Sequence, residues 1–187
     1  MRTTFLSLLF FFIMISCASE SDEIDSSPIT NYEWKLNSFI TSVPIDLNQD
    51  GIASTDMVLE FECMRNEGYS FIPPSLVRYF NSGLNIEGEY IDNEFVVFNF
   101  SCIEEEELIP TFPMIGDYKM IASNKIKFKY HNVLVVGGTG PVEEEYTLVG
   151  DKLIKVTNSL YPTIYDAVNQ RWIKTNITIT REYTKAF

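Results

Sequence analysis

The sequence has little of what most catalytic and metal-binding sites are built from. Its 187 residues include one histidine and three cysteines, which disfavours a histidine-based catalytic triad and a zinc site made of cysteine and histidine. Lysine and arginine number 14 against 26 aspartates and glutamates, so the formal net charge is −12. We do not expect such an acidic chain to bind nucleic acid or, by electrostatics, anionic lipid. No nucleophile–base pair is visible, so the sequence predicts a protein that is not an enzyme.

What the chain does have begins with an apolar run at its N-terminus. The run Phe5–Ile15 is too short to span a bilayer but has the length of the apolar part of an export signal. Residues Met14–Cys17 resemble the lipobox of bacterial lipoproteins, in which a signal peptidase cuts before an acylated cysteine. The sequence therefore predicts a signal peptide over 1–16 and lipidation of Cys17. An ordinary secretory signal is the alternative.

An acidic stretch follows the predicted cleavage site. It contains Glu20, Asp22, Glu23 and Asp25, and we expect residues 17–30 to be a flexible tether that joins the folded domain to the bilayer. Acidic residues just after the lipidated cysteine also resemble the surface-export signal of lipoproteins in Bacteroidetes-type bacteria. The expected location is the outer membrane. Whether the folded domain faces the cell surface or the periplasm is left open.

The rest of the chain alternates apolar and polar residues with a period of two. The stretches Lys125–His131 and Asn176–Tyr183 are clear examples, and turn signals separate such runs. This pattern predicts an all-β fold: one domain over 31–187, an antiparallel β-barrel of eight to ten strands. One short helix is expected over about residues 55–61, with Ser54 as its N-cap. An immunoglobulin-type sandwich is the architectural alternative, although its Cys, Trp, Cys order is missing.

Two residues near the ends of the domain resemble a feature of lipocalins. Trp34 lies on the first predicted strand, and Arg181 lies on the inward face of the last. In lipocalins a tryptophan near the chain start packs against an arginine of the last strand and closes one barrel end. The resemblance implies that the Arg181 guanidinium stacks on the Trp34 indole and donates to nearby carbonyl groups.

A second resemblance is to the lipocalin-like lipoproteins of Bacteroidetes-type bacteria. Members often carry a tryptophan–lysine–leucine opening, an aspartate-rich loop and a short helix that ends near a cysteine. The matching segments are Trp34–Leu36, Asp46–Gly51, Ser54–Glu62 and Cys63, and the likeness extends to Tyr183. It implies a lipocalin-like fold and a lipoprotein, and it names no ligand.

The aspartate-rich loop is the most specific chemical motif of the mature chain. Oxygen-bearing side chains at loop positions one, three and five, followed by glycine at six, match the start of an EF-hand calcium loop. The sequence thus predicts a weak, structural calcium site whose ligands are Asp46, Asn48, Asp50, the Ile52 carbonyl and Asp56. A turn rich in Asn and Asp, with no cation, is the competing interpretation.

The two remaining cysteines, Cys63 and Cys102, are expected to form a disulfide, because an exported chain folds in an oxidising compartment. Two buried free thiols are the alternative. The acidic runs Glu104–Glu107 and Glu143–Glu145 are interpreted as solvated surface, and His131 as an exposed residue of the polar face.

Two functions remain open at this stage. The first is a membrane-anchored extracytoplasmic lipoprotein whose barrel holds a small apolar ligand, since an eight-stranded barrel can enclose one. The second is a solid-core module that contacts a protein or glycan at the cell surface, because the 26 aromatic residues fill a barrel equally well. The ligand-binding residues cannot be assigned from the sequence.

Overall fold

The structure, a computed structural model, describes residues 28–80, 82–103, 114–130, 134–135, 138–139 and 142–186. Strands make up most of this part of the chain, with two short helical turns between the second and third strands. The strands are β1 (Glu33–Ile45), β2 (Ser54–Asp56), β3 (Gly68–Ile72), β4 (Leu76–Phe80), β5 (Leu84–Ile91), β6 (Glu94–Cys102), β7 (Met114–Ala122), β8 (Lys125–Tyr130), β9 (Leu134–Val135), β10 (Gly138–Thr139), β11 (Val142–Val149), β12 (Lys152–Asp166) and β13 (Arg171–Ala186). The helical turns are α1 (Met57–Glu60) and the 3-10 turn η1 (Glu62–Asn66).

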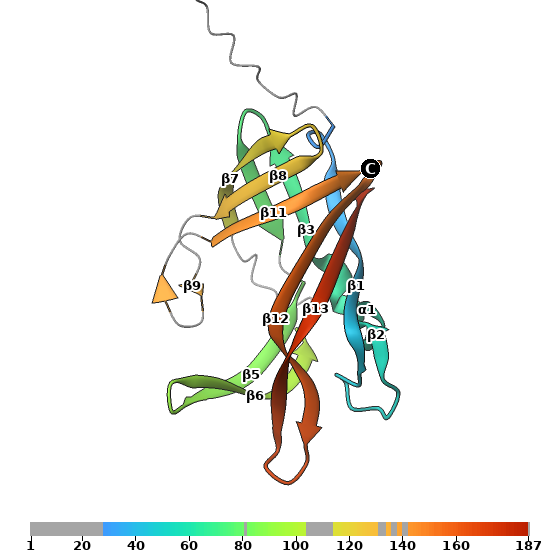
Figure 1. Cartoon of the computed structure of the whole chain (residues 1–187), viewed down its shortest axis with the longest axis vertical. Helices are drawn as coiled ribbons and strands as arrows, with labels where there is room; N and C mark the ends of the chain where they lie inside the picture. Colours follow the sequence, from blue (N-terminus) through green and yellow to red (C-terminus); the bar gives the residue numbers. More distant parts are fainter. Residues whose placement is uncertain are drawn as a thin grey trace, which may run out of the picture.

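Eight of these strands close into an antiparallel barrel (Figure 1). Their order around the barrel is β1-β3-β4-β7-β8-β11-β12-β13, and β13 pairs with β1 to complete the ring. Neighbouring strands in this order are joined by backbone hydrogen bonds. The short β2 pairs with β1 outside the ring, while β5–β6 and β9–β10 form separate hairpins. The predicted all-β barrel and its strand number are confirmed.

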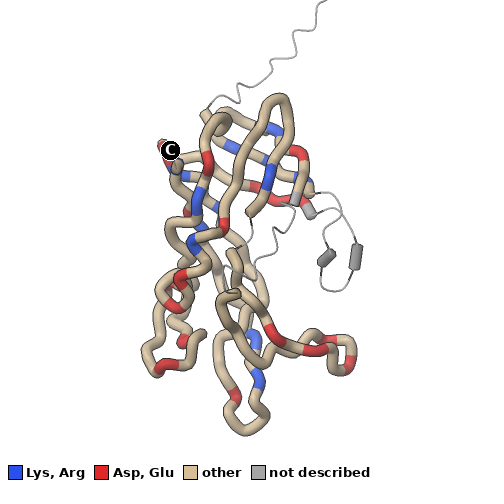
Figure 2. The backbone as a smooth tube through the Cα atoms, turned by 180° about the vertical axis from the view of Figure 1, so that it is seen from behind, with Lys and Arg blue, Asp and Glu red and all other residues tan. Residues whose placement is uncertain are grey.

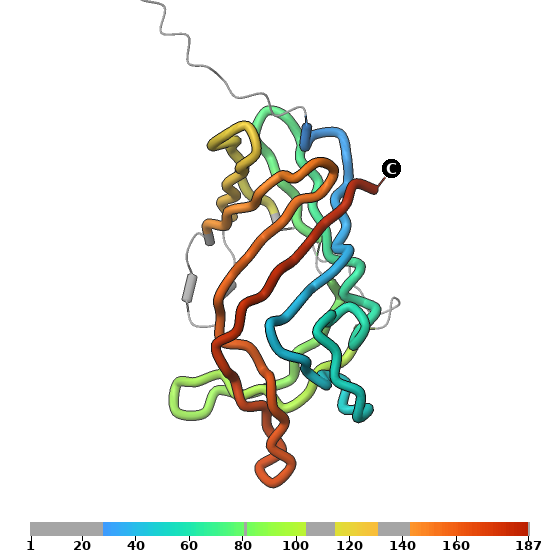
Figure 3. Tube along the Cα trace, turned by 45° about the vertical axis from the view of Figure 1, so that its right-hand side comes forward, coloured from blue at the N-terminus to red at the C-terminus, as the bar shows by residue number. Residues whose placement is uncertain are grey.

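The two ends of the barrel differ in their connections. At one end, which we call the turn end, tight turns join β3 to β4, β7 to β8 and β11 to β12. The described chain also begins and finishes there, since Glu33 pairs with Ala186 (Figure 3). At the opposite end, the loop end, the connections are long: they include α1, η1 and the β5–β6 hairpin, and the β12–β13 hairpin projects beyond the barrel (Figure 1).

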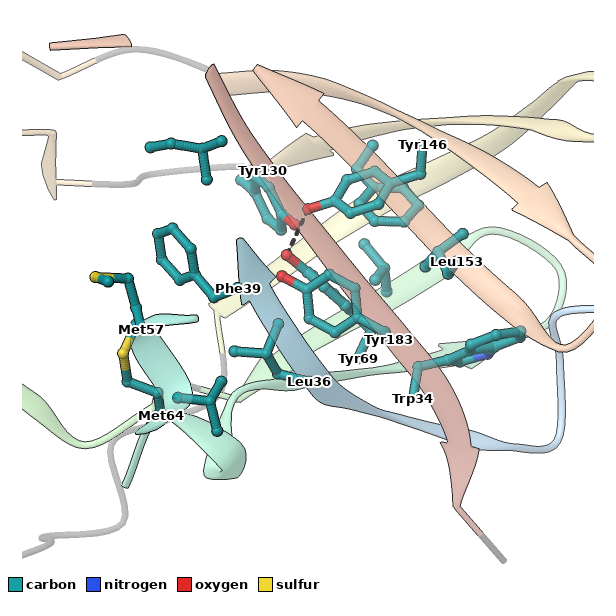
Figure 4. Packing of buried hydrophobic residues seen from close by; sticks show 14 of the residues in the cluster. Trp34, Leu36, Phe39, Met57, Met64, Tyr69, Tyr130, Tyr146, Leu153 and Tyr183 are labelled. Carbon is teal, nitrogen blue, oxygen red and sulfur yellow. Dashed lines mark hydrogen bonds between the residues drawn. The ribbon is translucent and has the colours of Figure 1, made fainter. Parts of the chain in front are cut away.

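Aromatic side chains fill the barrel from the turn end to its middle. Alternate residues of each strand point inward, and Trp34, Tyr69, Phe128 and Tyr183 are each at most 2% exposed. The Tyr69 ring centre lies 5.3 Å from that of Phe128 and 4.9 Å from that of Tyr183. Figure 4 shows Trp34, Tyr69 and Tyr183 among the buried side chains that converge from several strands. Burial of each such ring stabilises the fold by roughly 1.5–3 kcal/mol.

Close backbone contact fixes the start of β3 against β1. Gly68 lies opposite Lys35, and a Cβ atom there would stand 2.5 Å from the Trp34 carbonyl oxygen. Only glycine fits at that distance. The pairing of β1 with β13 also shifts register between Leu36 and Ser38. As a result the Phe39 side chain, and not that of Ser38, points toward the interior.

A second packed region lies below the barrel at the loop end. The β5–β6 hairpin packs against the inner face of the projecting β12–β13 hairpin, where the Phe100 and Trp172 rings meet edge to face at 5.6 Å. The Lys174 ammonium donates to the Phe95 carbonyl oxygen. The predicted disulfide is present: it joins Cys63 of η1 to Cys102 at the end of β6, with their Cα atoms 5.9 Å apart. These contacts hold the projecting hairpin from one side.

The predicted helix is shorter than expected and has a different cap. The chain pairs as β2 through Asp56, so α1 covers only Met57–Glu60. Asp56, not Ser54, is the N-cap, because its carboxylate accepts the Val58 backbone N–H at 3.2 Å.

Candidate functional site

A cluster of polar side chains crosses the middle of the barrel. We call it the interior polar cluster, and it contains two acids, two bases and three tyrosines: Glu67, Glu144, Lys155, Arg181, Tyr69, Tyr146 and Tyr183. Glu67 directly precedes β3, and the other members lie on β3, β11, β12 and β13. The cluster lies on the loop-end side of the packed rings. Figure 4 shows the hydroxyl ends of its three tyrosines and of Tyr130 turned toward one another.

The first charge pair of the cluster joins Glu67 to Arg181. Glu67 is 4% exposed, and its Oε1 lies 3.7 Å from the Arg181 Nη1. The Tyr183 hydroxyl donates to the same carboxylate oxygen. The Arg181 Cζ also stands 4.6 Å from the centre of the Phe39 ring. A buried carboxylate is costly without partners, and here a cation and a hydroxyl supply them.

The second charge pair joins Glu144 to Lys155. Their side chains form a close ion pair, and the Tyr146 hydroxyl donates to the other Glu144 oxygen at 2.9 Å. The Tyr146 hydroxyl is also 2.6 Å from that of Tyr69, which links the pair to β3. Burial lowers the pKa of the Lys155 ammonium, and the neighbouring Glu144 carboxylate opposes that shift.

Strand register explains why two cations lie side by side inside the barrel. Lys155 of β12 pairs with Arg181 of β13, and Arg181 pairs with Phe39 of β1. Like charges directly opposite each other on neighbouring strands are destabilising. The two carboxylates, each bound to one cation, offset this repulsion and leave the cluster with no formal net charge.

Part of the Arg181 side chain is accessible to solvent at the level of this cluster. Arg181 shares the inward face of β13 with the buried Ile179 and Tyr183, yet its side chain is 29% exposed. Within the described residues, the β11–β12 ladder consists of three pairs near the turn end, from Val149–Lys152 to Thr147–Ile154. The barrel wall is therefore held by side chains rather than by backbone hydrogen bonds beside Lys155. Trp34 and Tyr183 are fully buried toward the turn end, where an open pocket lies on the outside of the packed rings, beside Tyr32, Phe71 and Pro73.

Two buried polar groups, one in the cluster and one beside it, have no hydrogen-bond partner in the described part of the chain. The Tyr130 hydroxyl and the Arg181 Nε are buried and accept or donate no hydrogen bond there. Such groups usually find a protein or water partner when buried.

The tyrosines predict how stability changes at alkaline pH. Burial raises the pKa of Tyr161 to about 12, and burial also raises the pKa of Tyr69, Tyr146 and Tyr183 above the ordinary value of 10.0. The stabilisation that depends on neutral tyrosines is complete below the unfolded-state pKa near 10 and is lost as pH rises through the folded-state values. We expect cooperative unfolding above pH 10, with tyrosinate absorbance of the buried rings rising together with loss of structure. Gradual ionisation in a folded protein would contradict this.

The predicted contact between Trp34 and Arg181 is wrong. Register places Lys185, not Arg181, opposite Trp34, and the Lys185 Nζ lies 5.6 Å from the indole ring centre. The Lys185 ammonium also binds Asp151 at 2.7 Å. Trp34 is fully buried at the turn end, where its Nε1 donates to the Ile29 carbonyl oxygen at 3.0 Å. Arg181 lies on β13 further from the turn end than Lys185, and its guanidinium stacks on the Phe39 ring.

The aspartate-rich loop folds as a self-contained turn. Asp46 accepts the backbone N–H groups of Asp50 and Gly51 at 3.0 and 2.8 Å, and Asp50 accepts that of Ile52 at 2.8 Å. Asn48 accepts the Asp50 N–H as well. Gly51 has a φ of +89°, as the sharp turn requires. These hydrogen bonds shape the loop.

Asp56 does not belong to this loop. Its carboxylate accepts the Phe39 backbone N–H at 3.0 Å and caps α1. Glu60 instead braces the loop, since its carboxylate accepts the Leu47 N–H at 2.9 Å. Among the residues that the structure describes, no group of three or more His, Cys, Asp or Glu side chains is arranged to hold a metal ion. Calcium binding by Asp46, Asn48, Asp50 and the Ile52 carbonyl stays a prediction.

Sequence reasoning missed Glu144 as a site residue. The run Glu143–Glu145 was interpreted as surface, and Glu143 does form an exposed ion pair with Lys127. Glu144, however, shares the inward face with Tyr146, two residues further on. The alternation of inward and outward side chains along β11 is the sequence signal that could have identified Glu144. Cys17, Glu104–Glu107 and His131 lie outside the described residues.

No family model, no curated protein and no solved structure matches the chain.

Proposed function

We propose that the protein is a membrane-anchored extracytoplasmic lipoprotein whose barrel holds a small, mainly apolar molecule at its loop end. The observation that carries the proposal is the accessible Arg181 on the inward face of a closed barrel. Eight-stranded barrels can hold one small ligand, and the buried rings packed toward the turn end would give such a ligand a floor.

The interior suggests which chemistry the ligand has. Phe39 and Tyr161, whose ring centres are 5.7 Å apart, offer aromatic surface beside Arg181. The unpartnered Arg181 Nε and Tyr130 hydroxyl can bond to an oxygen atom of a ligand. A molecule with an apolar body and one polar end fits both features. Both carboxylates of the cluster already have a cation and a hydroxyl as partners, so we propose binding rather than catalysis.

The first strand, β1, begins at the turn end of the barrel. A lipid anchor on Cys17, which precedes β1 in the sequence, would therefore join the domain at that end. Acyl chains on Cys17 would then hold the turn end toward the bilayer, with the loop end pointing away from it, at the cell surface or in the periplasm. Within the described residues, no helix is both long enough and apolar enough to cross a membrane.

An apolar fluorescent probe tests the ligand site. We expect anilinonaphthalene sulfonate to bind the protein with one-to-one saturation. Thr157 faces inward, since it pairs with the buried Ile179, so Thr157→Trp should fill the space below the cluster and weaken binding at least tenfold. Asn158→Trp, on the outer face of the same strand, is the matched control and should leave binding unchanged. Equal binding by the two variants would contradict an interior site.

A surface-interaction role is the second candidate, and one feature favours it. The β12–β13 hairpin projects beyond the loop end of the barrel (Figure 3), and its apolar side chains Leu160, Ile164 and Val168 are exposed. Exposed apolar patches of this kind commonly mark contacts with other macromolecules.

A further inference from the structure

An open pocket of about 570 Å³ lies at the turn end, on the outside of the packed rings. It forms where β1 begins and where β3 and β13 end, and Figure 3 shows the start of β1 beside the end of β13. Glu33 pairs with Ser70 of β3 on one side and with Ala186 of β13 on the other. Because the next residue, Trp34, points into the barrel, these three side chains point outward. Two small side chains beside Glu33 leave room above the sheet.

The lining of this pocket combines apolar surface with polar groups. An amide and a hydroxyl can each donate and accept hydrogen bonds, and a carboxylate accepts them. Pockets of this size, with an apolar wall and a few polar groups, are typical of small-molecule sites. A molecule that has both hydroxyl groups and apolar C–H surface matches such a lining. The apolar residues that matter here are Tyr32, Ile72 and Pro73, and the polar ones are Asn31, Glu33 and Ser70.

The charges around the pocket favour a ligand that carries none. Among the described lining residues Glu33 alone is charged, and its carboxylate already lies 3.6 Å from the Lys35 ammonium. An anion would approach that carboxylate on a protein of net charge −12. A cation would compete with Lys35 and would approach the Lys185 ammonium, which lies 4.5 Å from the centre of the Tyr32 ring. Figure 2 shows acidic residues gathered on the segments that project at the loop end, away from this pocket.

The backbone around the pocket is held firmly. Backbone ladders run along both sides of Glu33, and the Trp34 indole N–H donates to the Ile29 carbonyl oxygen at 3.0 Å. Ile29 and Trp34 are both fully buried, so Asn31 and Tyr32 lie between two anchored positions. A preformed site loses little conformational entropy when a ligand binds.

We propose that this turn-end pocket binds one sugar ring of an uncharged glycan. The ring hydroxyl groups bond to the polar side chains of the lining, and a C–H face of the ring packs on its apolar surface. The pocket is separate from the proposed interior site, because Ser70 points outward whereas its neighbours Tyr69 and Phe71 are buried inside the barrel. An open pocket covers only part of a ligand, so we expect a dissociation constant of about 1 mM.

Saturation-transfer NMR on the full chain, in a detergent without sugar head groups, tests this pocket. The probes are four uncharged disaccharides: maltose, cellobiose, lactose and diacetylchitobiose. We expect at least one of them to bind. Ser70→Trp fills the pocket and should weaken that binding roughly tenfold, which is about 1.4 kcal/mol. The matched control is Ser123→Trp, at an exposed position in the turn between β7 and β8, and it should leave the affinity unchanged.

A second variant keeps the test independent of any effect of the added indole ring. Tyr32→Ala removes aromatic surface without filling the pocket, and it should also weaken sugar binding several-fold. Circular dichroism would show that each variant is folded. Anilinonaphthalene sulfonate should bind Ser70→Trp as it binds the wild type, because the two sites are separate. Loss of probe binding from every variant would therefore count against the interior site and not against this pocket.

Three results would overturn the inference. If none of the four sugars bound, the pocket would not be a glycan site. Equal sugar binding by Ser70→Trp and Ser123→Trp would place the sugar elsewhere on the protein. Tighter binding of a charged sugar, such as glucosamine or glucuronic acid, than of its uncharged counterpart glucose would contradict the argument from charge.

Discussion

Replacement of Trp34 by alanine should lower the free energy of unfolding by about 3–5 kcal/mol. The Trp34 side chain is fully buried at the turn end, and its removal leaves a cavity that the surrounding strands cannot fill. The Ile29 carbonyl oxygen also loses the indole N–H that it accepts at 3.0 Å. Because domains are typically stable by only about 5–15 kcal/mol, this one change should remove a large part of the stability.

Urea unfolding followed by circular dichroism measures this loss. Tyr90→Ala is the control, because Tyr90 is a large aromatic residue at an exposed position of the β5–β6 hairpin. It should change the free energy of unfolding by no more than about 0.5 kcal/mol. If the two variants were equally stable, the burial of Trp34 would not be what stabilises the turn end.

The second large effect is expected from Glu67→Gln. This change keeps the size of the side chain but leaves the Arg181 guanidinium beside a neutral amide inside the barrel. Breaking a buried ion pair by removing one charge costs about 3–5 kcal/mol. We expect the lower end of that range, because part of the Arg181 side chain reaches solvent. Tyr183 keeps an acceptor in the glutamine oxygen, so the loss reports mainly the charge.

A double-mutant cycle isolates this pair. Arg181→Met alone should also destabilise the protein, since it leaves Glu67 buried and unpaired. The double variant Glu67→Gln with Arg181→Met should be more stable than either single variant, because no buried charge remains unpaired. The exposed pair Lys127–Glu143 supplies the control, and Glu143→Gln should have little effect. Additive losses at Glu67 and Arg181 would show that the two groups do not interact.

The fold was predictable from local pattern to a large extent. Period-two alternation in Lys125–His131 and Asn176–Tyr183 predicted strands that the structure confirms as parts of β8 and β13. Closure of the barrel is a different matter, because it depends on pairing between β1 and β13 at opposite ends of the domain. Alternation predicts which face of a strand is buried, but it does not predict the cross-strand register.

The same limit explains which site residues were misjudged. Arg181 was correctly placed on the inward face, but its neighbour across β1 is Phe39, and a register shift in β1 contributes to that pairing. Asp56 was assigned to the calcium loop from its spacing alone, whereas the structure uses it as a helix cap. The partners of Glu67 and Glu144 lie far from them in the sequence, so neither charge pair could be found from spacing.

Native mass spectrometry tests the proposed ligand-holding barrel most directly. The protein would be expressed with export, in a soluble form that begins at Glu20 and keeps every described residue, and purified without detergent. We predict an additional mass that leaves on denaturation, one molecule per chain, and a Thr157→Trp variant that lacks it. A bare protein mass for the wild type, together with no probe binding in solution, would contradict the interior ligand site. The protein would then be a solid-core interaction module.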